Sequence, residues 1–252
     1  MEATSAPVRR ISVGNVINET FSIYGQNFLP LIGSAIIVFV IVGIITGLLQ
    51  AGGGVILALL AAVVGLAGRA LYTGFVVKLV EDVRDGRRDQ TIGDLFSSAM
   101  PAILPLIAFG ILFGIGVAIG LVLIIVPGLI LLTFWSVGAP AIVAEGVGPI
   151  EAFGRSWNLV KGNAWSVFGS LVVVLLIVIV IGIILAVIAT PIGDGALIVA
   201  NIISGAISAP IFAIAVTVIF FDLGGGRAPA APAAPAAPAA PSEPPPPSTP
   251  AA

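Results

Sequence analysis

The 252-residue sequence contains no cysteine and no histidine. The absence of cysteine excludes disulfides, thiolate metal sites and cysteine nucleophiles. The absence of histidine removes the usual proton shuttle near neutral pH and the commonest metal ligand. We therefore predict neither a metal site nor a cofactor.

Charged residues are also scarce, at 9% of the chain against about 25% in soluble globular proteins, while hydrophobic residues make up 59%. Several uninterrupted apolar runs of about 20 residues are too many for the core of a soluble 25.4 kDa domain. The composition therefore predicts an integral membrane protein. The formal net charge of -2 identifies no partner by itself, and we expect membrane lipids and no nucleic acid as partners.

Six apolar segments have the length of membrane-spanning helices. At a rise of ~1.5 Å per residue, segments of about 17 to 26 residues cross a hydrocarbon core of ~30 Å with differing tilts. The short alternating segments that characterise a membrane β-barrel do not occur in the sequence. We therefore predict an all-α, polytopic membrane helix bundle with spans at residues 28–50, 55–80, 104–126, 128–144, 165–190 and 196–221.

The fourth predicted span is the shortest, and it contains Pro140. Pro127 and Gly128 predict a tight turn between the third and fourth spans. These two segments therefore form either a hairpin that crosses the membrane or a re-entrant hairpin that only dips into it.

Lys and Arg are distributed unevenly between the two ends of these spans. The segments that join spans one to two, three to four and five to six contain neither residue type, and nine of the ten cations lie at the opposite ends. These nine are Arg9, Arg10, Lys78, Arg84, Arg87, Arg88, Arg155, Lys161 and Arg227. Because cationic loops stay on the cytoplasmic side, the distribution predicts a multi-pass protein of the inner (cytoplasmic) membrane with both termini in the cytoplasm.

The stretch EAFGRSWNLVKGNAW, residues 151–165, is unusually polar for a segment between two apolar spans. Pro149 suits the first turn of a helix and Gly162 the residue just past its end. Glu151 and Arg155 are spaced for an i,i+4 ion pair on one face. The opposite, apolar face comprises Ile150, Phe153, Trp157 and Val160.

This pattern predicts an amphipathic helix that lies in the headgroup layer of the membrane. Tryptophan rings favour that layer because they combine an apolar body with a polar N–H, and long cationic side chains reach outward from it. The candidate lipid-facing residues are Arg155, Trp157, Lys161 and Trp165.

Two further amphipathic segments, at residues 12–28 and 91–101, precede the first and third spans. The predicted apolar face of the first comprises Val13, Val16, Ile17, Phe21 and Tyr24, and that of the second Ile92, Leu95, Phe96 and Ala99. Ser12 and Thr91 each stand where a helix N-cap is expected. The segment NFLPLIGS, which starts at Asn27, aligns without gaps with NAWSVFGS, which starts at Asn163. We therefore predict three cytoplasmic interfacial helices in a threefold repeat of one surface helix plus two spans, beginning near residues 12, 91 and 148. The alternative is three independent interfacial anchors.

Three stretches carry a resemblance to a known family: PAIVAEGVGPIEAFGRSWNLVKGNAWSVFG, VEDVRDGRRDQTIGDLF and AVTVIFFDL. Over residues 12–223 the chain resembles the membrane domain of glycerophosphoryl diester phosphodiesterases and of related stand-alone bacterial membrane proteins. The most specific element is an acidic residue at the end of a span, here Glu145, followed by Glu-Ala, Arg-Ser-Trp and a basic residue with Gly. In such enzymes the resemblance implies that a separate soluble barrel domain, with catalytic His and metal-binding carboxylates, performs the hydrolysis. The present residues form no such domain.

Acidic residues cluster between the second and third spans and alternate there with arginines. A divalent-cation site is one interpretation, and a solvated loop of mixed charge is the commoner outcome of such a pattern. Phosphodiester hydrolysis needs a group that titrates near neutral pH, or a metal held by several carboxylates or imidazoles. We therefore predict that the chain is not an enzyme. The acidic residues of this cluster are Glu81, Asp82, Asp85, Asp89 and Asp94.

A transporter is the main alternative, because internal repeats are a common transporter plan with binding sites near the bilayer midplane. Proton-coupled carriers usually place Asp, Glu or His within their spans, and the apolar spans here contain none. Arg69 is the one charge well inside a span, and it either snorkels to the cytoplasmic headgroups or has a function. Asn201 is the second intramembrane polar candidate, and it can bond to a neighbouring helix.

Glycines four residues apart within the spans predict faces at which helices pack closely. These pairs are Gly43 with Gly47, Gly110 with Gly114, and Gly116 with Gly120. Functional hinges are the alternative.

The predicted organisation is a flexible N-terminus at residues 1–11, a six-span membrane domain at 12–223 and a disordered Pro/Ala-rich tail at 224–252. We predict that the membrane domain interacts with lipid or acts as a scaffold for a protein partner. Such a partner would dock at the cytoplasmic face or on the proline-rich tail. The alternatives are a transporter of small solutes or lipids and an accessory component of a glycerophosphodiester phosphodiesterase.

Overall fold

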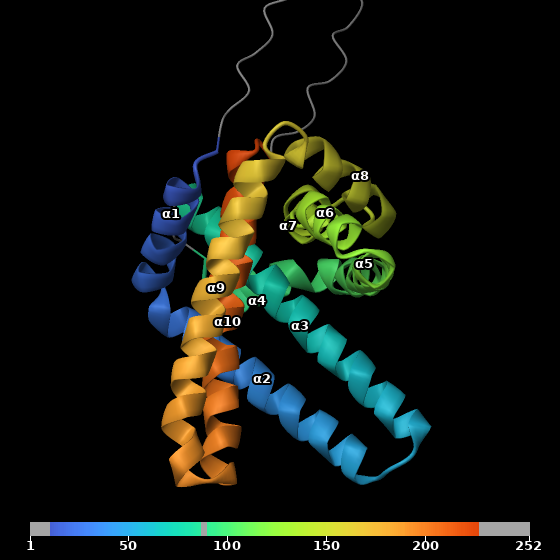
Figure 1. Cartoon of the computed structure of the whole chain (residues 1–252), viewed down its shortest axis with the longest axis vertical. Coiled ribbons are helices and arrows are strands. Elements are labelled where there is room, and N and C mark those ends of the chain that lie inside the picture. The colour runs from blue at the N-terminus through green and yellow to red at the C-terminus, as the bar shows by residue number, and fades with distance from the viewer. Residues whose placement is uncertain (1–10, 87–89, 227–252) are drawn as a thin grey trace, which may run out of the picture.

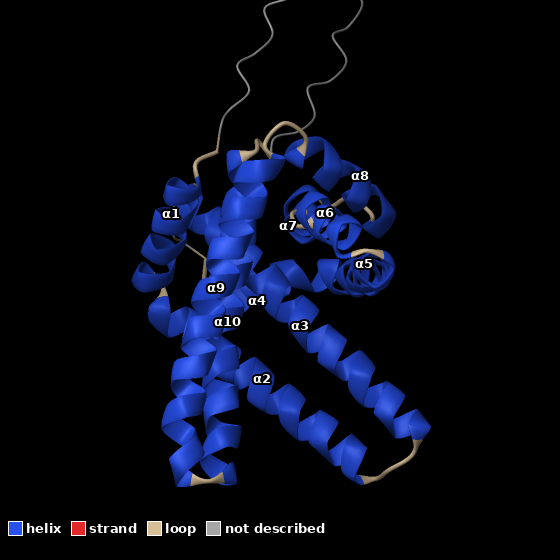
Figure 2. Cartoon of the chain, viewed as in Figure 1, coloured by secondary structure: helices blue, strands red, loops and turns tan. Residues whose placement is uncertain are grey.

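The computed structural model describes residues 11–86 and 90–226. Within these residues the chain folds into helices joined by short turns, and no strand occurs there (Figure 2). In chain order the elements are α1 (Val13–Gln26), α2 (Phe28–Ala51), α3 (Val55–Arg84), α4 (Ile92–Ala99), η1 (Met100–Ala102), α5 (Ile103–Leu123), α6 (Ile125–Trp135), α7 (Gly138–Glu145), α8 (Pro149–Val160), α9 (Ala164–Ala189), η2 (Thr190–Ile192) and α10 (Asp194–Asp222).

Six helical segments are long and apolar enough to cross a membrane, as the sequence predicted. They pair in chain order into three hairpins, α2 with α3, α5 with α6, and α9 with α10 (Figure 1). α7 completes the fourth span after a break at Ser136 and Val137, and Pro140 lies in its first turn. The predicted all-α membrane helix bundle is therefore confirmed.

The turn between the third and fourth spans lies at Ile124 and not at Pro127 and Gly128, where the sequence predicted it. Ile124 has an extended backbone, with φ -158° and ψ 135°, between the end of α5 and the start of α6. Pro127 falls in the first turn of α6, where its missing N–H removes no intrahelical hydrogen bond. Gly128 lies against α5, since a Cβ on Gly120 would be 2.9 Å from the Gly128 Cα atom.

The two ends of the molecule are packed differently. We call the end that carries α1, α4 and α8 the base, and we call the turns after α2, α5 and η2, which point away from the base in different directions, the distal ends of the three hairpins. Near the base, α2 buries Leu31 and Val38, and α3 buries most of its residues between 70 and 80. Towards its distal end the same hairpin exposes large apolar side chains such as Leu48 and Val55. In Figure 1 the hairpins α2/α3 and α9/α10 diverge from the base, while α5 and α6 are seen nearly end on.

Each hairpin is preceded by a short helix at the base, in the order that the predicted repeat requires. Ser12 accepts a hydrogen bond from the Asn15 N–H at the start of α1, and Thr91 and Asp94 form a capping box at the start of α4. The predicted N-caps are therefore correct.

The aligned positions of the first and third units also share their local geometry. Asn27 has φ -119° and ψ 29° before α2, and Asn163 has φ -123° and ψ 15° before α9. Ser34 and Ser170 are both buried, and each hydroxyl donates to the carbonyl four residues earlier. This agreement supports a structural repeat over three independent anchors.

The buried faces of the base helices are rotated from the predicted ones. α1 buries Val16, Thr20, Ile23 and Tyr24. Phe21, which was expected on the apolar face, is partly exposed. α4 follows the prediction more closely, because Leu95 and Ala99 are buried and Phe96 stacks on Phe75 with ring centroids 4.4 Å apart.

The folded part extends slightly beyond the predicted domain at 12–223. Ile11 is buried against the main core. Residues 224–226 close α10 with a turn in which the Gly225 N–H donates to the Phe220 carbonyl. A Cβ on Gly225 would collide with the Phe220 ring, so the turn requires glycine there. The rest of the predicted flexible N-terminus and of the predicted tail lies outside the described residues.

Candidate functional site

The polar stretch at residues 151–165 forms α8 and the start of α9, and α8 packs on the protein's own helices. Ala152, Ser156 and Val160 form its buried stripe. The Ser156 hydroxyl donates to the Phe134 carbonyl at 2.7 Å and accepts a hydrogen bond from the Val137 N–H at 3.2 Å. Ser156 thereby satisfies backbone groups that the break between α6 and α7 leaves without helical partners.

Arg155 of α8 forms a two-bonded ion pair with Glu145 at the end of α7. Arg155 Nε lies 2.7 Å from Glu145 Oε2, and Arg155 Nη2 lies 2.7 Å from Glu145 Oε1. These hydrogen bonds raise the pKa of Arg155 above its ordinary value. The predicted partner, Glu151, is exposed, because the carboxylate at the end of α7 lies nearer to the guanidinium than the local i,i+4 position.

Glu145 also receives a hydrogen bond from the Gly226 N–H at 2.9 Å. This predicted span-end acid therefore joins α7, α8 and the turn after α10. Arg155 and Ser156 thus dock α8 on the protein, and Trp157 stacks on Phe134 with ring centroids 4.2 Å apart.

The remaining predicted lipid-facing residues lie at the outer surface of the base. Lys161 follows α8 and is exposed. Trp165 is 85% exposed in the first turn of α9, and Trp157 is 40% exposed in spite of its stacking. Ile150, predicted on the same apolar face as Trp157, is also exposed. α8 thus packs one face on the protein, while Ile150 and Trp157 of α8, Lys161 after it and Trp165 of α9 are exposed.

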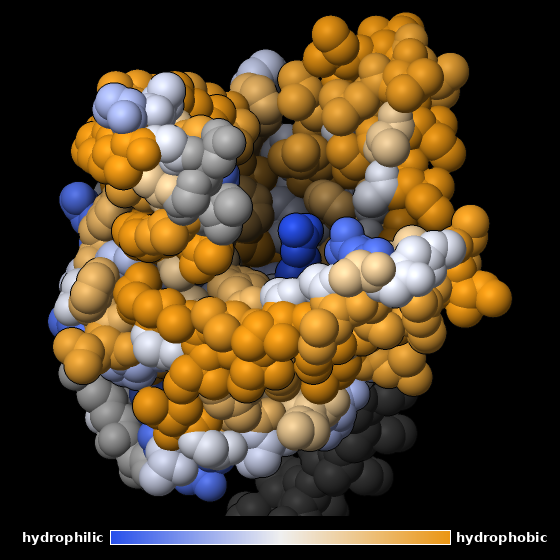
Figure 3. Space-filling view, turned by 90° about the horizontal axis from the view of Figure 1, so that it is seen from below, coloured by the Kyte–Doolittle hydropathy of each residue, from blue (hydrophilic) through white to orange (hydrophobic). Residues whose placement is uncertain are grey.

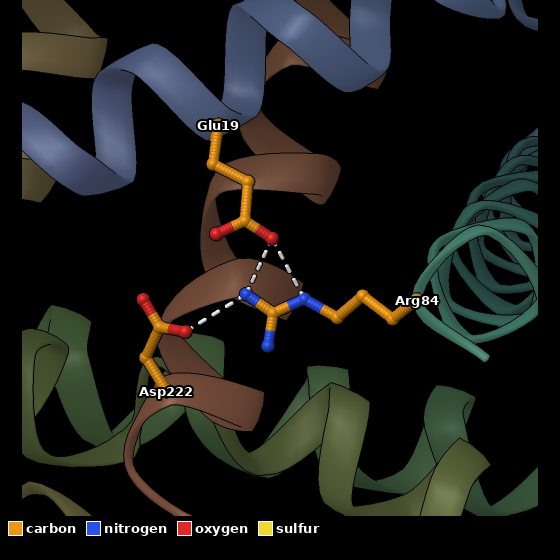
Figure 4. Close-up of polar contacts among 3 residues, drawn as sticks. All are labelled: Glu19, Arg84 and Asp222. Carbon is orange, nitrogen blue, oxygen red and sulfur yellow. Dashed lines mark hydrogen bonds and ion pairs between the residues drawn. The ribbon is translucent and has the colours of Figure 1, made fainter. Parts of the chain in front are cut away.

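A second ion-pair cluster at the base was not predicted from the sequence. Arg84, the last residue of α3, binds Glu19 of α1 and Asp222, the last residue of α10 (Figure 4). Its Nη2 atom lies 2.6 Å from Glu19 Oε1 and 2.8 Å from Asp222 Oδ1. The guanidinium also lies 5.4 Å from the Phe221 ring centroid. Arg84 therefore ties the first unit of the repeat to the third.

The predicted acidic cluster divides into separate pairs. Glu81 binds Lys78 at 2.8 Å, and Asp94 caps α4. Among the described residues, no group of three or more acidic side chains is placed to hold a metal ion. Asp89 lies outside the described residues.

The three hairpins enclose a cavity of about 1080 Å³. Its walls are mostly apolar, and they include Phe39 and Gly43 from the first hairpin, Phe109 and Gly110 from the second, and Leu175 and Phe212 from the third. Figure 3, which views the molecule from below, shows a hollow with hydrophilic residues inside and hydrophobic residues around it. The sequence could not locate this cavity, because its walls come from segments far apart in the chain.

Both intramembrane polar candidates, Arg69 and Asn201, line this cavity. The Asn201 amide donates to the Leu197 carbonyl of its own helix at 2.9 Å, and among the described residues it has no hydrogen bond to a neighbouring helix, which was the interpretation considered from the sequence. Arg69 is exposed to the cavity and has no hydrogen-bond or ion-pair partner within the described part of the chain. No Asp or Glu is among the described residues of the cavity wall.

Comparison with known proteins gives a family without a function. A family model with the description "Domain of unknown function (DUF7847)" matches residues 46–220. No curated protein and no solved structure matches the chain. The match covers the second to fifth spans completely and the sixth up to its last two residues, together with the whole cavity wall except Phe39, Val40, Gly43 and Ile44.

Proposed function

The chain belongs to the family of the domain of unknown function DUF7847, which names no activity. From the geometry of the structure, we propose that the protein is a non-catalytic membrane protein that binds a lipid between its three hairpins. The observation that carries this proposal is the cavity of about 1080 Å³, which has walls from all three hairpins. Pockets for drug-sized ligands measure roughly 300 to 1,000 Å³, so this cavity is large enough for a bulkier molecule.

The character of the walls favours lipid over a small polar solute. The cavity is lined mainly by aliphatic and aromatic side chains of membrane-spanning helices. The adjoining distal halves of the spans expose apolar side chains that only hydrocarbon can cover favourably. A molecule with long acyl chains can therefore fill the cavity and pass from it to the surrounding bilayer without crossing a polar barrier.

The base fits the same function as an anchor on one membrane surface. We propose that the exposed side chains of Trp157, Lys161 and Trp165 meet lipid headgroups and that this surface is cytoplasmic, as the distribution of cations predicts. The resemblance to the membrane domain of glycerophosphoryl diester phosphodiesterases is compatible with this role, since the resemblance attributes the hydrolysis to a separate domain. A transporter of small solutes has weaker support, because Tyr72, Asn201 and other polar groups of the wall bond to backbone carbonyls.

Glycine substitutions test lipid binding with matched controls. Gly43 and Gly110 line the cavity, and a Cβ added at either position meets no atom within 4 Å. Gly47 and Gly114 lie one helical turn further along and have the same free space, but they do not belong to the cavity wall. Leucine at the first two positions would therefore fill the cavity, whereas leucine at the other two would leave it open.

The measurement is the amount of lipid that stays with the purified full-length protein after extensive detergent washing, determined by extraction and mass spectrometry. We expect Gly43→Leu and Gly110→Leu to retain at most about half of the wild-type lipid, because their side chains occupy volume that the ligand needs. Gly47→Leu and Gly114→Leu should retain the wild-type amount. Equal retention by all four variants would contradict the proposal.

A further inference from the structure

We propose that Arg69 binds the phosphate group of an anionic phospholipid that enters the cavity from the bilayer. This inference rests on the proposed function and names the class of its ligand. Binding of phosphate by Arg69 depends on the charge of the cavity wall, whereas lipid binding as such depends on the volume of the cavity. The two proposals can therefore be tested separately.

The charge of Arg69 has a free-energy cost, because the residue lies within a membrane-spanning helix. Charged side chains within membrane spans are rare, and they almost always pair with other groups or face a path for ligands. Arg69 has no partner in the described part of the chain, and the described cavity wall offers no carboxylate. The negative charge that stabilises this guanidinium must therefore come from a molecule inside the cavity.

The depth of Arg69 argues against the snorkelling alternative. Arg69 precedes Arg84 on the same continuous helix, which places it ~22 Å along α3 from the ion pairs of the base at a rise of ~1.5 Å per residue. The next residue, Ala70, is already buried in the packed part of the molecule. Arg69 thus lies where the hairpins begin to separate, and its side chain faces the cavity.

Ser208 provides a second unpartnered polar group in the same wall. Its Oγ atom is buried and has no hydrogen-bond partner among the described residues, and Ser208 lines the cavity. By contrast, the hydroxyls of Ser136 and Thr217 donate to carbonyls of the backbone. Arg69, Thr73 and Ser208 are therefore the polar side chains of the described wall without a hydrogen-bond partner, and Arg69 is the one among them that carries a charge and is exposed to the cavity.

The chemistry of the Arg69 guanidinium selects an oxyanion. A guanidinium presents parallel N–H groups that match two oxygens of a phosphate, and such charge-assisted bonds are about twice as strong as neutral ones. A free inorganic anion would satisfy the donors but would leave the apolar walls uncovered. A phospholipid satisfies both, with its phosphate at Arg69 and its acyl chains against the aliphatic and aromatic walls.

The test compares two phospholipids with identical acyl chains, anionic phosphatidylglycerol and zwitterionic phosphatidylcholine. The full-length protein is equilibrated with vesicles that contain equal parts of both, then re-extracted in detergent, and the bound lipids are quantified by mass spectrometry. We expect the wild-type protein to be enriched in phosphatidylglycerol by about fivefold or more, as one well-placed cation near an anionic headgroup provides.

The variants separate the role of Arg69 from general effects of charge. Arg69→Gln should lower the enrichment to about one and leave the total lipid per protein near the wild-type amount. Arg69→Lys should retain part of the enrichment, because it keeps the charge but loses the paired N–H groups of the guanidinium. Lys78→Gln, which removes a cation outside the cavity, should leave it unchanged.

Two results would overturn the inference. One is an enrichment that persists in Arg69→Gln, which would assign the preference to lipids at the outer surface. The other is saturable, Arg69-dependent binding of radiolabelled inorganic phosphate by lipid-free protein, which would make the ligand a free anion. Either result would leave the glycine experiment untouched, so failure of this inference is distinguishable from failure of lipid binding itself.

Discussion

Arg84 is the side chain that joins the two chain-terminal units of the molecule. It donates to Glu19 and Asp222, which precede and follow it by 65 and 138 residues. Two carboxylates that meet at one point repel each other unless a cation lies between them, and Arg84 supplies that cation at distances of 2.6 and 2.8 Å. The cluster is only partly exposed, so screening by water and salt is weaker than for an ion pair at a free surface.

The replacement Arg84→Met should therefore destabilise the protein by about 2 kcal/mol, because it leaves Glu19 and Asp222 without their cation. The measurement is the midpoint of thermal unfolding in a mild detergent, followed by tryptophan fluorescence. Lys78→Met is the control, since it removes only a local i,i+3 pair with Glu81 worth about 0.5 kcal/mol or less.

Neutralising both acids should rescue the loss at Arg84. In the triple variant with Arg84→Met, Glu19→Gln and Asp222→Asn, the repulsion is absent, and the midpoint should return more than half of the way to the wild-type value. An Arg84→Met protein as stable as Lys78→Met would refute the structural role of the cluster.

The ion pairs mark the limit of what residue spacing can predict. Spacing along one helix suggested Glu151 as the partner of Arg155, but the guanidinium binds Glu145, which belongs to another helix. The sequence did single out Glu145, Arg155 and Trp157 as members of one motif, yet it could not reveal that they meet around the end of α7. Partners that come together only through tertiary folding leave no periodic signal.

At the scale of elements, glycine controls how closely α5 and α6 pack. A Cβ on Gly128 would lie 2.5 Å from the Leu121 side chain, and one on Gly116 would lie 2.6 Å from the Trp135 ring. Gly114 stands on the same helix as Gly116, but nothing lies within 4 Å of its missing Cβ. The hairpin therefore depends on particular glycines and not on a glycine-rich composition.

We expect Gly128→Ala to lower the thermal midpoint clearly, by the equivalent of about 1 to 3 kcal/mol, because the added methyl group overpacks the helix contact. Gly114→Ala should leave the midpoint unchanged or raise it slightly, since alanine favours the helix and meets no neighbour. If both variants behaved alike, the close approach of α5 and α6 near Ile124 would be wrong.

The type and number of the helices could be predicted from hydropathy, but the faces at which the helices pack on one another could not. The six spans and the three short helices at the base were predicted from apolar runs and helical periodicity. The glycine pairs were all interpreted as contact faces, but only Gly116 and Gly120 meet another helix, and Gly43 and Gly110 line the cavity. Spacing four residues apart identifies one face of a helix, and it carries no information on whether a helix or a lipid covers that face.

At the scale of the whole molecule, the buried core and the ion pairs lie at the same end. The base contains the buried core and the ion pairs, and the distal halves of the hairpins expose apolar side chains. Contacts at the base fix how the hairpins diverge, and that divergence creates the cavity. These contacts join residues far apart in the chain, which is why the sequence predicted the spans but not the space between them.

The uneven distribution of cations makes a prediction about orientation that the chain is well suited to test. It has no native cysteine, so a single introduced cysteine is the only thiol that a reagent can modify. Gln50, Val126 and Ile192 are exposed positions at the distal ends of the hairpins, and Gln90 and Asn158 are exposed positions at the base. In intact cells, a membrane-impermeant maleimide should modify cysteines at the three distal positions, and it should modify those at the base only after the cells are made permeable.

Labelling of each variant in denaturant provides the control, because a thiol held in lipid reacts slowly wherever it lies. Cysteine at Val126 is the decisive position, since it follows the turn at Ile124 that joins α5 to α6. Modification there from outside would place the second hairpin across the whole membrane. Labelling at Gln50 and Ile192 but not at Val126 would instead make α5 and α6 a re-entrant hairpin. In that case the cavity would open within a single leaflet, and Arg69 would draw its phospholipid from that leaflet alone.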